Sequence, residues 1–171
     1  LAGITNNTGS SEINCTVSAI NVTATGGLSY AWSGGATPST ASNSFNSAGT
    51  YTVTVTSANG CTGTASITTT LNTSAVLAGI TNNTGSSEIN CTVSAINVTA
   101  TGGLSYAWSG GATPSTASNS FNSAGTYTVT VTSANGCTGT ASITTTLNTS
   151  AVLAGITNNT GSSEINCTVS A

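Results

Sequence analysis

The sequence predicts an all-β protein, built as tandem small immunoglobulin-like β-sandwiches in a beads-on-a-string array. The first observation is a letter-for-letter repeat: the chain from Leu1 onward is identical to the chain from Leu77 onward, and a third copy begins at Leu153. The second is that apolar side chains in each copy recur at every other position, which is the period of a β-strand. The third is that short runs of Gly, Asn and Ser separate these stretches, as turns separate the strands of a sandwich.

The repeat defines the expected domains. A unit of 76 residues, the offset between Leu1 and Leu77, is longer than most solenoid repeats, which seldom exceed roughly 50 residues, and is large enough to hold a small core. Because the chain opens on Leu and stops inside a unit, we expect a segment of a longer polymer-like chain, with any signal peptide, anchor or terminal binding domain outside it. The expected domains are immunoglobulin-like repeat 1 over 1–76, an identical repeat 2 over 77–152, and the first strands of a third, truncated repeat over 153–171.

One stretch of each unit carries the clearest pattern. The sequence GTYTVTVTSANGC at 49–61 returns unchanged at 125–137. Its Tyr and Val side chains alternate with Thr, which places apolar groups on one face of a strand and hydroxyls on the other. The Asn59-Gly60 pair that follows is a strong signal for a tight turn. We therefore predict a half-buried strand and a hairpin that leads into a second strand over 62–70.

The same alternation places the other strands. Apolar positions change from odd to even between Val17 and Ile20, which one strand cannot do without a bulge or a turn. A tight turn is therefore expected at 16–19. The Gly-rich and Pro-containing stretch from Gly34 to Ser47 is predicted as a loop with two brief edge strands, one of them about Phe45. The remaining strands are expected at 1–6, 12–15, 20–24 and 28–33.

The aromatic residues mark the expected core. Trp32 is the only Trp of its unit and shares a strand face with Leu28 and Tyr30, so we expect it near the centre of the core. Tyr51 opens the penultimate strand and is a candidate for the tyrosine corner of an immunoglobulin-like domain. Ala65, Ile67 and Leu71 are also expected to face inward. The predicted core residues are Tyr30, Trp32, Tyr51, Val53, Val55, Tyr106, Trp108, Tyr127, Val129 and Val131.

The charge inventory excludes most chemistry. The chain contains no Lys, Arg, His or Asp, and its three acidic residues are one position repeated, Glu12, Glu88 and Glu164. Acid-base catalysis usually needs His, Asp, Lys or paired carboxylates, and nucleic-acid binding needs Lys or Arg. A Ca²⁺ site at Glu12 would have only amide and backbone carbonyls beside one carboxylate. We therefore predict that the protein is not an enzyme and has no catalytic residue, cofactor, metal site or nucleic-acid partner.

Other partners are expected from composition. The apolar fraction is 37%, but no continuous run is long enough to cross a bilayer, so no membrane insertion of this segment is expected. The main partners should be neighbouring repeats of the same chain. Charged side chains on edge strands normally prevent edge-to-edge pairing, and because this chain has so few of them, lateral pairing of identical chains stays open. Glycans also stay open, because N-glycosylation sequons begin at Asn6, Asn14, Asn21 and Asn72.

The five cysteines predict disulfides, because the chain has neither His nor a CxxC spacing for zinc. In an immunoglobulin-like order, Cys15 and Cys61 lie at opposite ends of one sandwich, roughly 20 to 30 Å apart, whereas a disulfide needs Cα atoms within about 7 Å. A bond within a unit is therefore unfavourable unless the first strand runs differently. Two pairings between units stay open: Cys15 with Cys137, or Cys61 with Cys91 and Cys137 with Cys167. We favour a bond between units, which would staple each junction.

A row of threonines raises a separate possibility. Thr50, Thr52, Thr54 and Thr56 face outward from one strand and resemble the threonine ladders of ice-binding proteins. Thr is also a good strand residue that needs no ligand to explain it, and the twist of a sandwich sheet disturbs the flat array that ice recognition requires. Ice binding is therefore kept as a minor alternative.

Three pieces of the unit together resemble a known repeat type. They are ITNNTGSSEINC, INVTATGGLSYAWSGG and AGTYTVTVTSANGCTGTASITTT, and they cover nearly all of each copy. The unit resembles the tandem immunoglobulin-like (PKD-like) repeats of giant cell-surface adhesins of Bacteroidota, similar to the gliding-motility adhesin exported by the type IX secretion system. Such repeats often carry Asp where this chain has Ser57, so a calcium role is not carried over.

These observations predict a structural role rather than a catalytic one. We expect the structural shaft of an extracellular filament or giant surface adhesin, which spaces a distal binding region away from the cell surface. Identical copies suit a spacer, because the number of copies sets its length. The alternative is a repetitive polysaccharide-binding module that acts by avidity, which exposed Tyr or Trp side chains in one concave row would favour.

Overall fold

The computed structural model describes residues 1–159, 161 and 163, and every regular element among them is a β-strand. This confirms the predicted all-β class. No helix in this part of the chain has the length and hydropathy of a membrane span. The strands of the first repeat are β1 (Gly3–Asn6), β2 (Glu12–Asn14), β3 (Ile20–Thr25), β4 (Ser29–Trp32), β5 (Ser42–Phe45), β6 (Gly49–Thr56) and β7 (Thr62–Asn72). Those of the second repeat are β8 (Gly79–Asn82), β9 (Glu88–Ile89), β10 (Ile96–Thr101), β11 (Ser105–Trp108), β12 (Ser118–Phe121), β13 (Gly125–Thr132) and β14 (Thr138–Leu147).

Each repeat folds into two sheets. In the first repeat, a three-stranded sheet has the order β1-β3-β5 and a four-stranded sheet has the order β2-β7-β6-β4. The pairs are antiparallel except β2 with β7, which is parallel. The chain changes sheet at every connection except the one from β6 to β7, and this is the crossed order of an immunoglobulin-like sandwich. The second repeat has the same two sheets, β8-β10-β12 and β9-β14-β13-β11.

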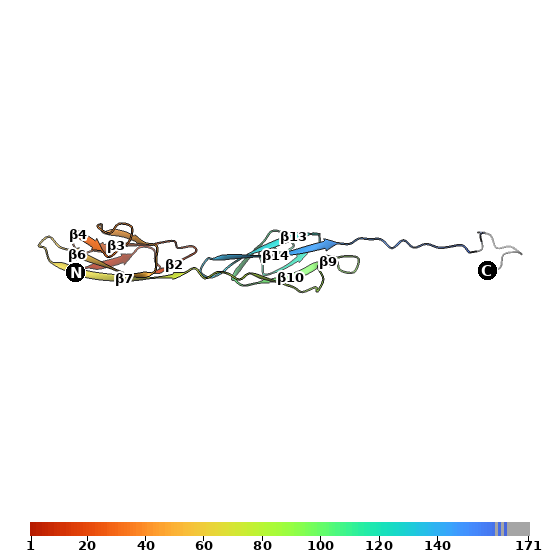
Figure 1. The fold of residues 1–171 in the computed structure, drawn as a ribbon, viewed down its shortest axis with the longest axis horizontal. Helices are drawn as coiled ribbons and strands as arrows, with labels where there is room; N and C mark the ends of the chain where they lie inside the picture. The colour runs from red at the N-terminus through yellow and green to blue at the C-terminus, as the bar shows by residue number, and fades with distance from the viewer. Residues whose placement is uncertain (160, 162, 164–171) are drawn as a thin grey trace.

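The predicted hairpin forms between β6 and β7. Its ladder runs from the pair Gly49 and Thr69 to the pair Thr56 and Thr62. The turn is closed because the Ser57 amide donates to the Cys61 carbonyl at 2.9 Å. Gly60 has a φ of 83°, a conformation that costs Gly little. This hairpin turn lies at the outer end of its sandwich (Figure 1).

Two separate hydrophobic clusters fill the sandwiches, one per repeat. In the first cluster, Ile20 and Phe45 are the most deeply buried large side chains, at 0% and 1% exposed. Trp32 is 6% exposed and meets the Phe45 ring edge-on, with ring centroids 5.5 Å apart. Its indole N–H donates to the Thr40 carbonyl at 2.9 Å. Phe45 therefore occupies the centre, and Trp32 closes the core beside it.

The tyrosines line the rim of the core. The ring of Tyr51 stacks on Phe45 with centroids 3.8 Å apart, and its hydroxyl donates to the Ser47 carbonyl, four residues upstream, at 3.2 Å. This is the hydrogen-bond pattern of a tyrosine corner. Of the predicted core residues, Trp32, Val53, Val55, Trp108, Val129 and Val131 are buried, and Tyr30, Tyr51, Tyr106 and Tyr127 are half-buried against the same clusters.

Three local predictions were wrong. Leu28 is 76% exposed because β4 begins only at Ser29 and Leu28 lies in the preceding turn. Leu71 is 54% exposed because β6 pairs with β7 only as far as Thr69, so that β2 alone flanks β7 at Leu71. The stretch between Gly34 and Ser47 holds one strand, β5, rather than two.

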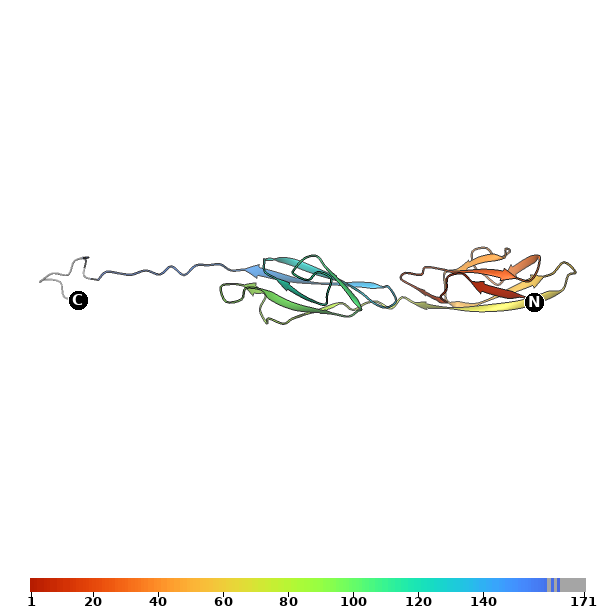
Figure 2. The same cartoon turned by 180° about the vertical axis from the view of Figure 1, so that it is seen from behind.

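The two sandwiches follow one another along the long axis of the molecule, as both views show (Figures 1 and 2). Beyond β14 the chain leaves the second sandwich as an extended segment (Figure 1). Residues 153–159 contain no strand, although Gly155 to Asn158 repeat the sequence of β1.

Candidate functional site at the joint between the repeats

A disulfide joins the two sandwiches where they meet. Cys15 follows β2 at the end of the first sandwich, and Cys137 precedes β14 in the hairpin turn of the second. They are bonded, with Cα atoms 4.9 Å apart and a sequence separation of 122 residues. The sandwich topology explains this meeting, because the turn after β2 and the turn before β14 lie at the two ends that face each other.

The turn that presents Cys15 is held by its own residues. The side-chain oxygen of Asn14 accepts hydrogen bonds from the amides of Thr16 and Val17 at 3.0 and 2.9 Å. The same Asx turn forms in the second repeat, where Asn90 accepts from the amide of Thr92 at 2.9 Å. A turn fixed by its own sequence needs no partner to take this shape. The first and second repeats therefore present Cys15 and Cys91 in the same way.

Hydrogen bonds across the joint surround the disulfide. The Cys15 amide donates to the Asn135 carbonyl at 3.2 Å. The Asn135 side-chain amide donates to the Asn72 side-chain oxygen at 3.1 Å and to the carbonyls of Asn72 and Ser74 at 3.3 and 3.4 Å. Asn135 thus ties the second sandwich to the last residue of β7 and to the linker that follows it.

The linker also packs into the second sandwich. Val76 belongs to the partly buried residues on the second core, and its carbonyl lies against Gly139, where a Cβ would overlap it. Cys137 is only 5% exposed here and Val131 is 0% exposed. The joint therefore has three parts: the disulfide, the Asn135 contacts and the seated Val76.

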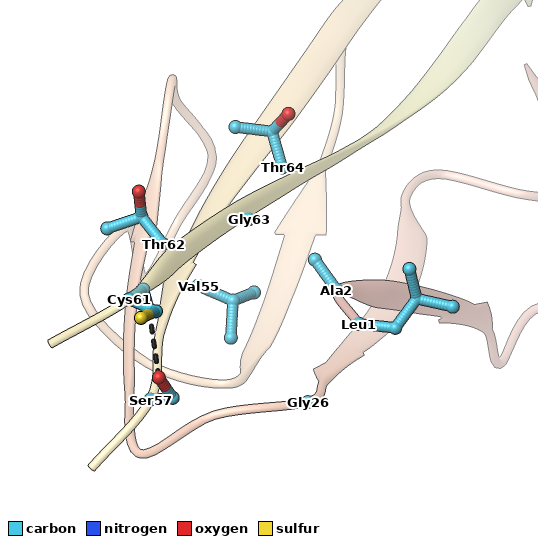
Figure 3. A pocket seen from close by; sticks show the side chains of 9 residues that line it. All are labelled: Leu1, Ala2, Gly26, Val55, Ser57, Cys61, Thr62, Gly63 and Thr64. Carbon is cyan, nitrogen blue, oxygen red and sulfur yellow. Dashed lines mark hydrogen bonds between the residues drawn. The ribbon is translucent and has the colours of Figure 1, made fainter. Parts of the chain in front are cut away.

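At the other end of the first sandwich, a hollow lies beside the hairpin turn that carries Cys61 (Figure 3). The hollow of about 350 Å³ lies between the amino-terminal residues and the β6–β7 hairpin, and its lining includes Leu1, Ala2, Val55, Cys61 and Gly63. Nothing covers Cys61, which is exposed and free. The sequence around it is identical to that around Cys137, so the difference comes only from what packs beside it.

The far end of the second sandwich carries the other free cysteine. Cys91 is exposed and free, and it borders a hollow of about 280 Å³ that Asn148, Ser150 and Val152 also line. At the internal joint the corresponding surface of the first sandwich is covered by the hairpin that carries Asn135.

The disulfide decides between the pairings that the sequence left open. Because Cys15 is bonded to Cys137, there is no bond from Cys15 to Cys61 within a repeat. The second set of pairings between units is wrong: Cys61 and Cys91 are both free, and Cys137 is not available to Cys167. Cys167 itself lies outside the described residues.

The hydroxyl row predicted on β6 faces outward, but its members bond to one another. Thr50 and Thr68 share a hydrogen bond between their hydroxyls at 3.0 Å, and Thr52 and Ser66 share one at 2.8 Å. These cross-strand pairs stabilise the sheet. They also occupy part of the hydrogen-bonding capacity that a ligand would use.

The acidic residue of each described repeat lies at the end of the sandwich where the last strand, β7 or β14, stops. The Asn72 side-chain amide donates to the Glu12 carboxylate at 3.5 Å, and Asn148 donates to Glu88 at 3.2 Å. Within the described residues, no three His, Cys, Asp or Glu side chains gather to hold a metal ion. Glu164 lies outside those residues.

Several residues of the joint were not found from the sequence. Asn135, Asn72 and Val76 carry its contacts, yet Asn135 has the same neighbours in sequence as Asn59, which is exposed. No local signal separates the two. Their different roles arise from position in the array, and the cysteine spacing was the one feature that pointed to the joint.

No protein-family model and no curated protein sequence matches the chain. Solved structures do. One is that of a Ca²⁺-stabilized adhesin that helps an Antarctic bacterium reach out and bind ice, with a TM-score of 0.53 and 21% identity over 89% of this chain and 50% of that one. Another concerns host cell surface retention of a 1.5-MDa bacterial ice-binding adhesin, with a TM-score of 0.47 and 19% identity over 88% of this chain and 66% of that one. The chain thus spans about half the length of the first of these structures, and the likeness shows that it shares a β-sandwich fold with part of that adhesin.

Proposed function

We propose that this chain is part of the structural shaft of an extracellular filament or giant surface adhesin, and that it spaces a distal binding region from the cell. The observation that carries the proposal is the joint between Cys15 and Cys137. A short peptide linker alone lets two domains swing about each other. A second covalent connection beside the linker, with hydrogen bonds from Asn135, restricts that motion and favours a rod.

The composition supports a mechanical role. A spacer needs length and resistance to proteolysis rather than reactive groups, and the chain has no Lys, Arg or His. Each repeat would add on the order of 35 to 40 Å to the shaft, if strands of about ten residues stack end to end. Length would then be set by the number of copies.

The fold likeness and the disulfide support the location. The similar structures belong to bacterial adhesins, and disulfides persist mainly outside the reducing cytosol. We place the chain at the cell surface, among the PKD-like repeats of giant adhesins of Bacteroidota that its motifs resemble. Its partners would be neighbouring repeats, with identical chains bound laterally along exposed sheet edges such as β4 and β5.

Ice binding is the second candidate, and the outward hydroxyls of β6 and β7 are the observation that favours it. The pairing of Thr50 with Thr68 and of Thr52 with Ser66 weighs against it. Polysaccharide binding has less support, because Tyr30 and Tyr51 are half-buried in the core rim. Thermal hysteresis by the 171-residue chain, compared with a Thr52→Val variant, would separate ice binding from the shaft.

The shaft is tested on intact cells of the source organism. Antibodies raised against this chain should label the surface without permeabilisation. Images of the labelled filaments should show a bead-like axial repeat of roughly 35 to 40 Å. Labelling only after permeabilisation, or a filament without an axial repeat, would contradict the proposal.

A further inference from the structure

The hairpin turn of each repeat contains the pair Asn-Gly, at 59–60 and at 135–136, and nowhere else in the chain does Gly follow Asn. The side chain of an Asn in such a pair can be attacked by the backbone nitrogen of the glycine, because glycine has no side chain to hinder the approach. We propose that the Asn135-Gly136 pair is a site of spontaneous deamidation, and that the closed, disulfide-bonded joint between the repeats holds the reaction in check. The proposal adds a covalent modification to the joint and does not depend on the shaft function.

The turn places hydrogen-bond donors on the atom where negative charge would develop. When a nucleophile adds to the side-chain carbonyl carbon of Asn135, charge moves onto the side-chain oxygen. The Ser133 hydroxyl donates a hydrogen bond to this oxygen, and the Cys137 amide donates to it at 3.2 Å. Donors that are already aimed at such an oxygen stabilise the charge as it forms. The turn therefore favours the reaction once the nucleophile reaches the carbon.

The reaction needs only water and a base from the solvent. The Gly136 nitrogen loses its proton to that base and bonds to the side-chain carbonyl carbon of Asn135. The side-chain nitrogen takes up the proton and leaves as ammonia, and a succinimide ring forms. Water then opens the ring at either carbonyl, which leaves aspartate or isoaspartate. One water is consumed, one ammonia is released, and no electron is transferred.

The closed joint opposes the movement that the reaction needs, because Asn135 must turn towards the Gly136 nitrogen. The side-chain nitrogen of Asn135 is held by the Asn72 side-chain oxygen at 3.1 Å and by the carbonyls of Asn72 and Ser74 at 3.3 and 3.4 Å. Thr16 of the first repeat lies so close to Gly136 that a Cβ there would overlap its methyl group. The turn therefore has little room to rearrange while the joint is closed.

The same turn in the first repeat gives a reference within the chain. The side-chain oxygen of Asn59 also accepts hydrogen bonds from the Ser57 hydroxyl and the Cys61 amide. Among the described residues, however, none accepts a hydrogen bond from the Asn59 side-chain nitrogen. Breaking one hydrogen bond of ordinary net strength lowers a population roughly fivefold. In this chain, Asn135 should therefore react at least about fivefold more slowly than Asn59.

Deamidation would leave the joint unable to close again. The product at 135 carries a carboxylate in place of an amide that donates to three acceptors, and the ammonia that has left does not return. Reduction of the disulfide between Cys15 and Cys137 would release the turn and allow the reaction. The modification would thus make opening of the joint irreversible.

The test follows both sites in one chain. Because the two turns have the same sequence, the exposed Thr62 is changed by Thr62→Ser, so that the two peptides differ in mass. Chymotrypsin, which cuts after Tyr and Leu, releases 52–71 and 128–147, each with a single Asn. The oxidised chain is incubated at mildly alkaline pH, and mass spectrometry measures the acid formed in each peptide against a zero-time sample. The expected rate at Asn135 is at least about fivefold below that at Asn59.

Reduction of the chain is the second arm. With a reductant present, the rate at Asn135 should rise towards the rate at Asn59, and the rate at Asn59 should not change. A thermal melt in the same buffer shows whether the second repeat stays folded, which separates opening of the joint from unfolding. A sample in urea is the reference, because the two sites have identical neighbours and should then convert at the same rate. The reciprocal marker, Thr138→Ser, should give the same rates.

Equal rates at the two sites in the oxidised, folded chain would overturn the protection by the joint. A rate at Asn135 that reduction leaves unchanged would overturn its dependence on the disulfide. If neither site forms acid over a time in which the urea sample converts, the turn is not a deamidation site in the folded protein. None of these results would change the surface labelling expected of the proposed shaft.

Discussion

Val76 lies so close to Gly139 that a Cβ on the glycine would overlap the Val76 carbonyl oxygen, whereas the identical Gly63 of the first repeat has only Ala2 near its Cβ position. Two glycines with the same sequence neighbours therefore have different surroundings. The difference is the linker, whose Val76 lies against Gly139, whereas only Ala2 lies near Gly63. This asymmetry allows the joint to be tested by matched substitutions.

Gly139→Ala should destabilise the second repeat, and Gly63→Ala should leave the first unchanged. The added methyl group at 139 must push the linker backbone away, which we expect to cost about 1 to 3 kcal/mol. Thermal unfolding of the two variants beside the parent measures the difference. Equal melting of both variants would mean that the linker does not press on Gly139.

The disulfide should shield most of the chain from an applied pulling force. A bond between residues separated by 122 positions bypasses that segment when the ends are pulled. Reduction should therefore add roughly 400 Å of contour length when both repeats unfold, at about 3.3 to 3.6 Å per residue. Single-molecule force extension with and without dithiothreitol measures this.

The control is a chain with Cys61→Ser, Cys91→Ser and Cys167→Ser, which keeps only the two cysteines of the joint and should behave as the parent does. The same extension in oxidised and reduced protein would show that the joint carries no load.

Phe45→Ala should unfold the first repeat, because Phe45 is the centre of the first core, 1% exposed, and contacts the rings of both Trp32 and Tyr51. Loss of a buried Phe side chain costs about 3 to 5 kcal/mol, a large share of the stability of a small domain. Leu28→Ala is the matched control, since Leu28 is 76% exposed. Circular dichroism melts should show an early transition in the Phe45 variant alone.

The strand pattern was predictable because it depends on local alternation. The Val side chains of β6 and the Asn59-Gly60 turn follow from the period of a strand and from turn chemistry. The predictions for Leu28 and Leu71 were wrong because alternation gives the face of a side chain but not where a strand begins or where the strand paired with it ends: β4 begins only at Ser29, and β6 stops pairing with β7 at Thr69. The central place of Phe45 was missed because β5 is short and Trp32 is the larger group.

The joint could be predicted only in part. Opposite placement of Cys15 and Cys61 follows from topology, which left two pairings between units open. The choice of Cys137 requires the relative position of two sandwiches, and so do the contacts of Asn135 and Val76. Identical repeats carry no local difference from which such contacts could be deduced.

Asn135 offers the sharpest test of the hydrogen bonds across the joint. Its side-chain amide donates to the Asn72 side-chain oxygen and to the Asn72 and Ser74 carbonyls, at 3.1 to 3.4 Å. Asn135→Asp would replace this donor with a carboxylate that faces three acceptors. We expect a loss of about 1 to 3 kcal/mol for the second repeat, as for other groups left without partners.

Asn59→Asp is the matched change in the first repeat, where the side-chain oxygen accepts from the Cys61 amide at 3.3 Å. A carboxylate retains that acceptor, so this variant should melt with the parent. Reducing the disulfide should enlarge the effect at Asn135, because the hydrogen bonds then carry more of the joint. If Asn135→Asp and Asn59→Asp melt alike before and after reduction, the amide does not hold the two repeats together, and the disulfide and the seated Val76 are sufficient.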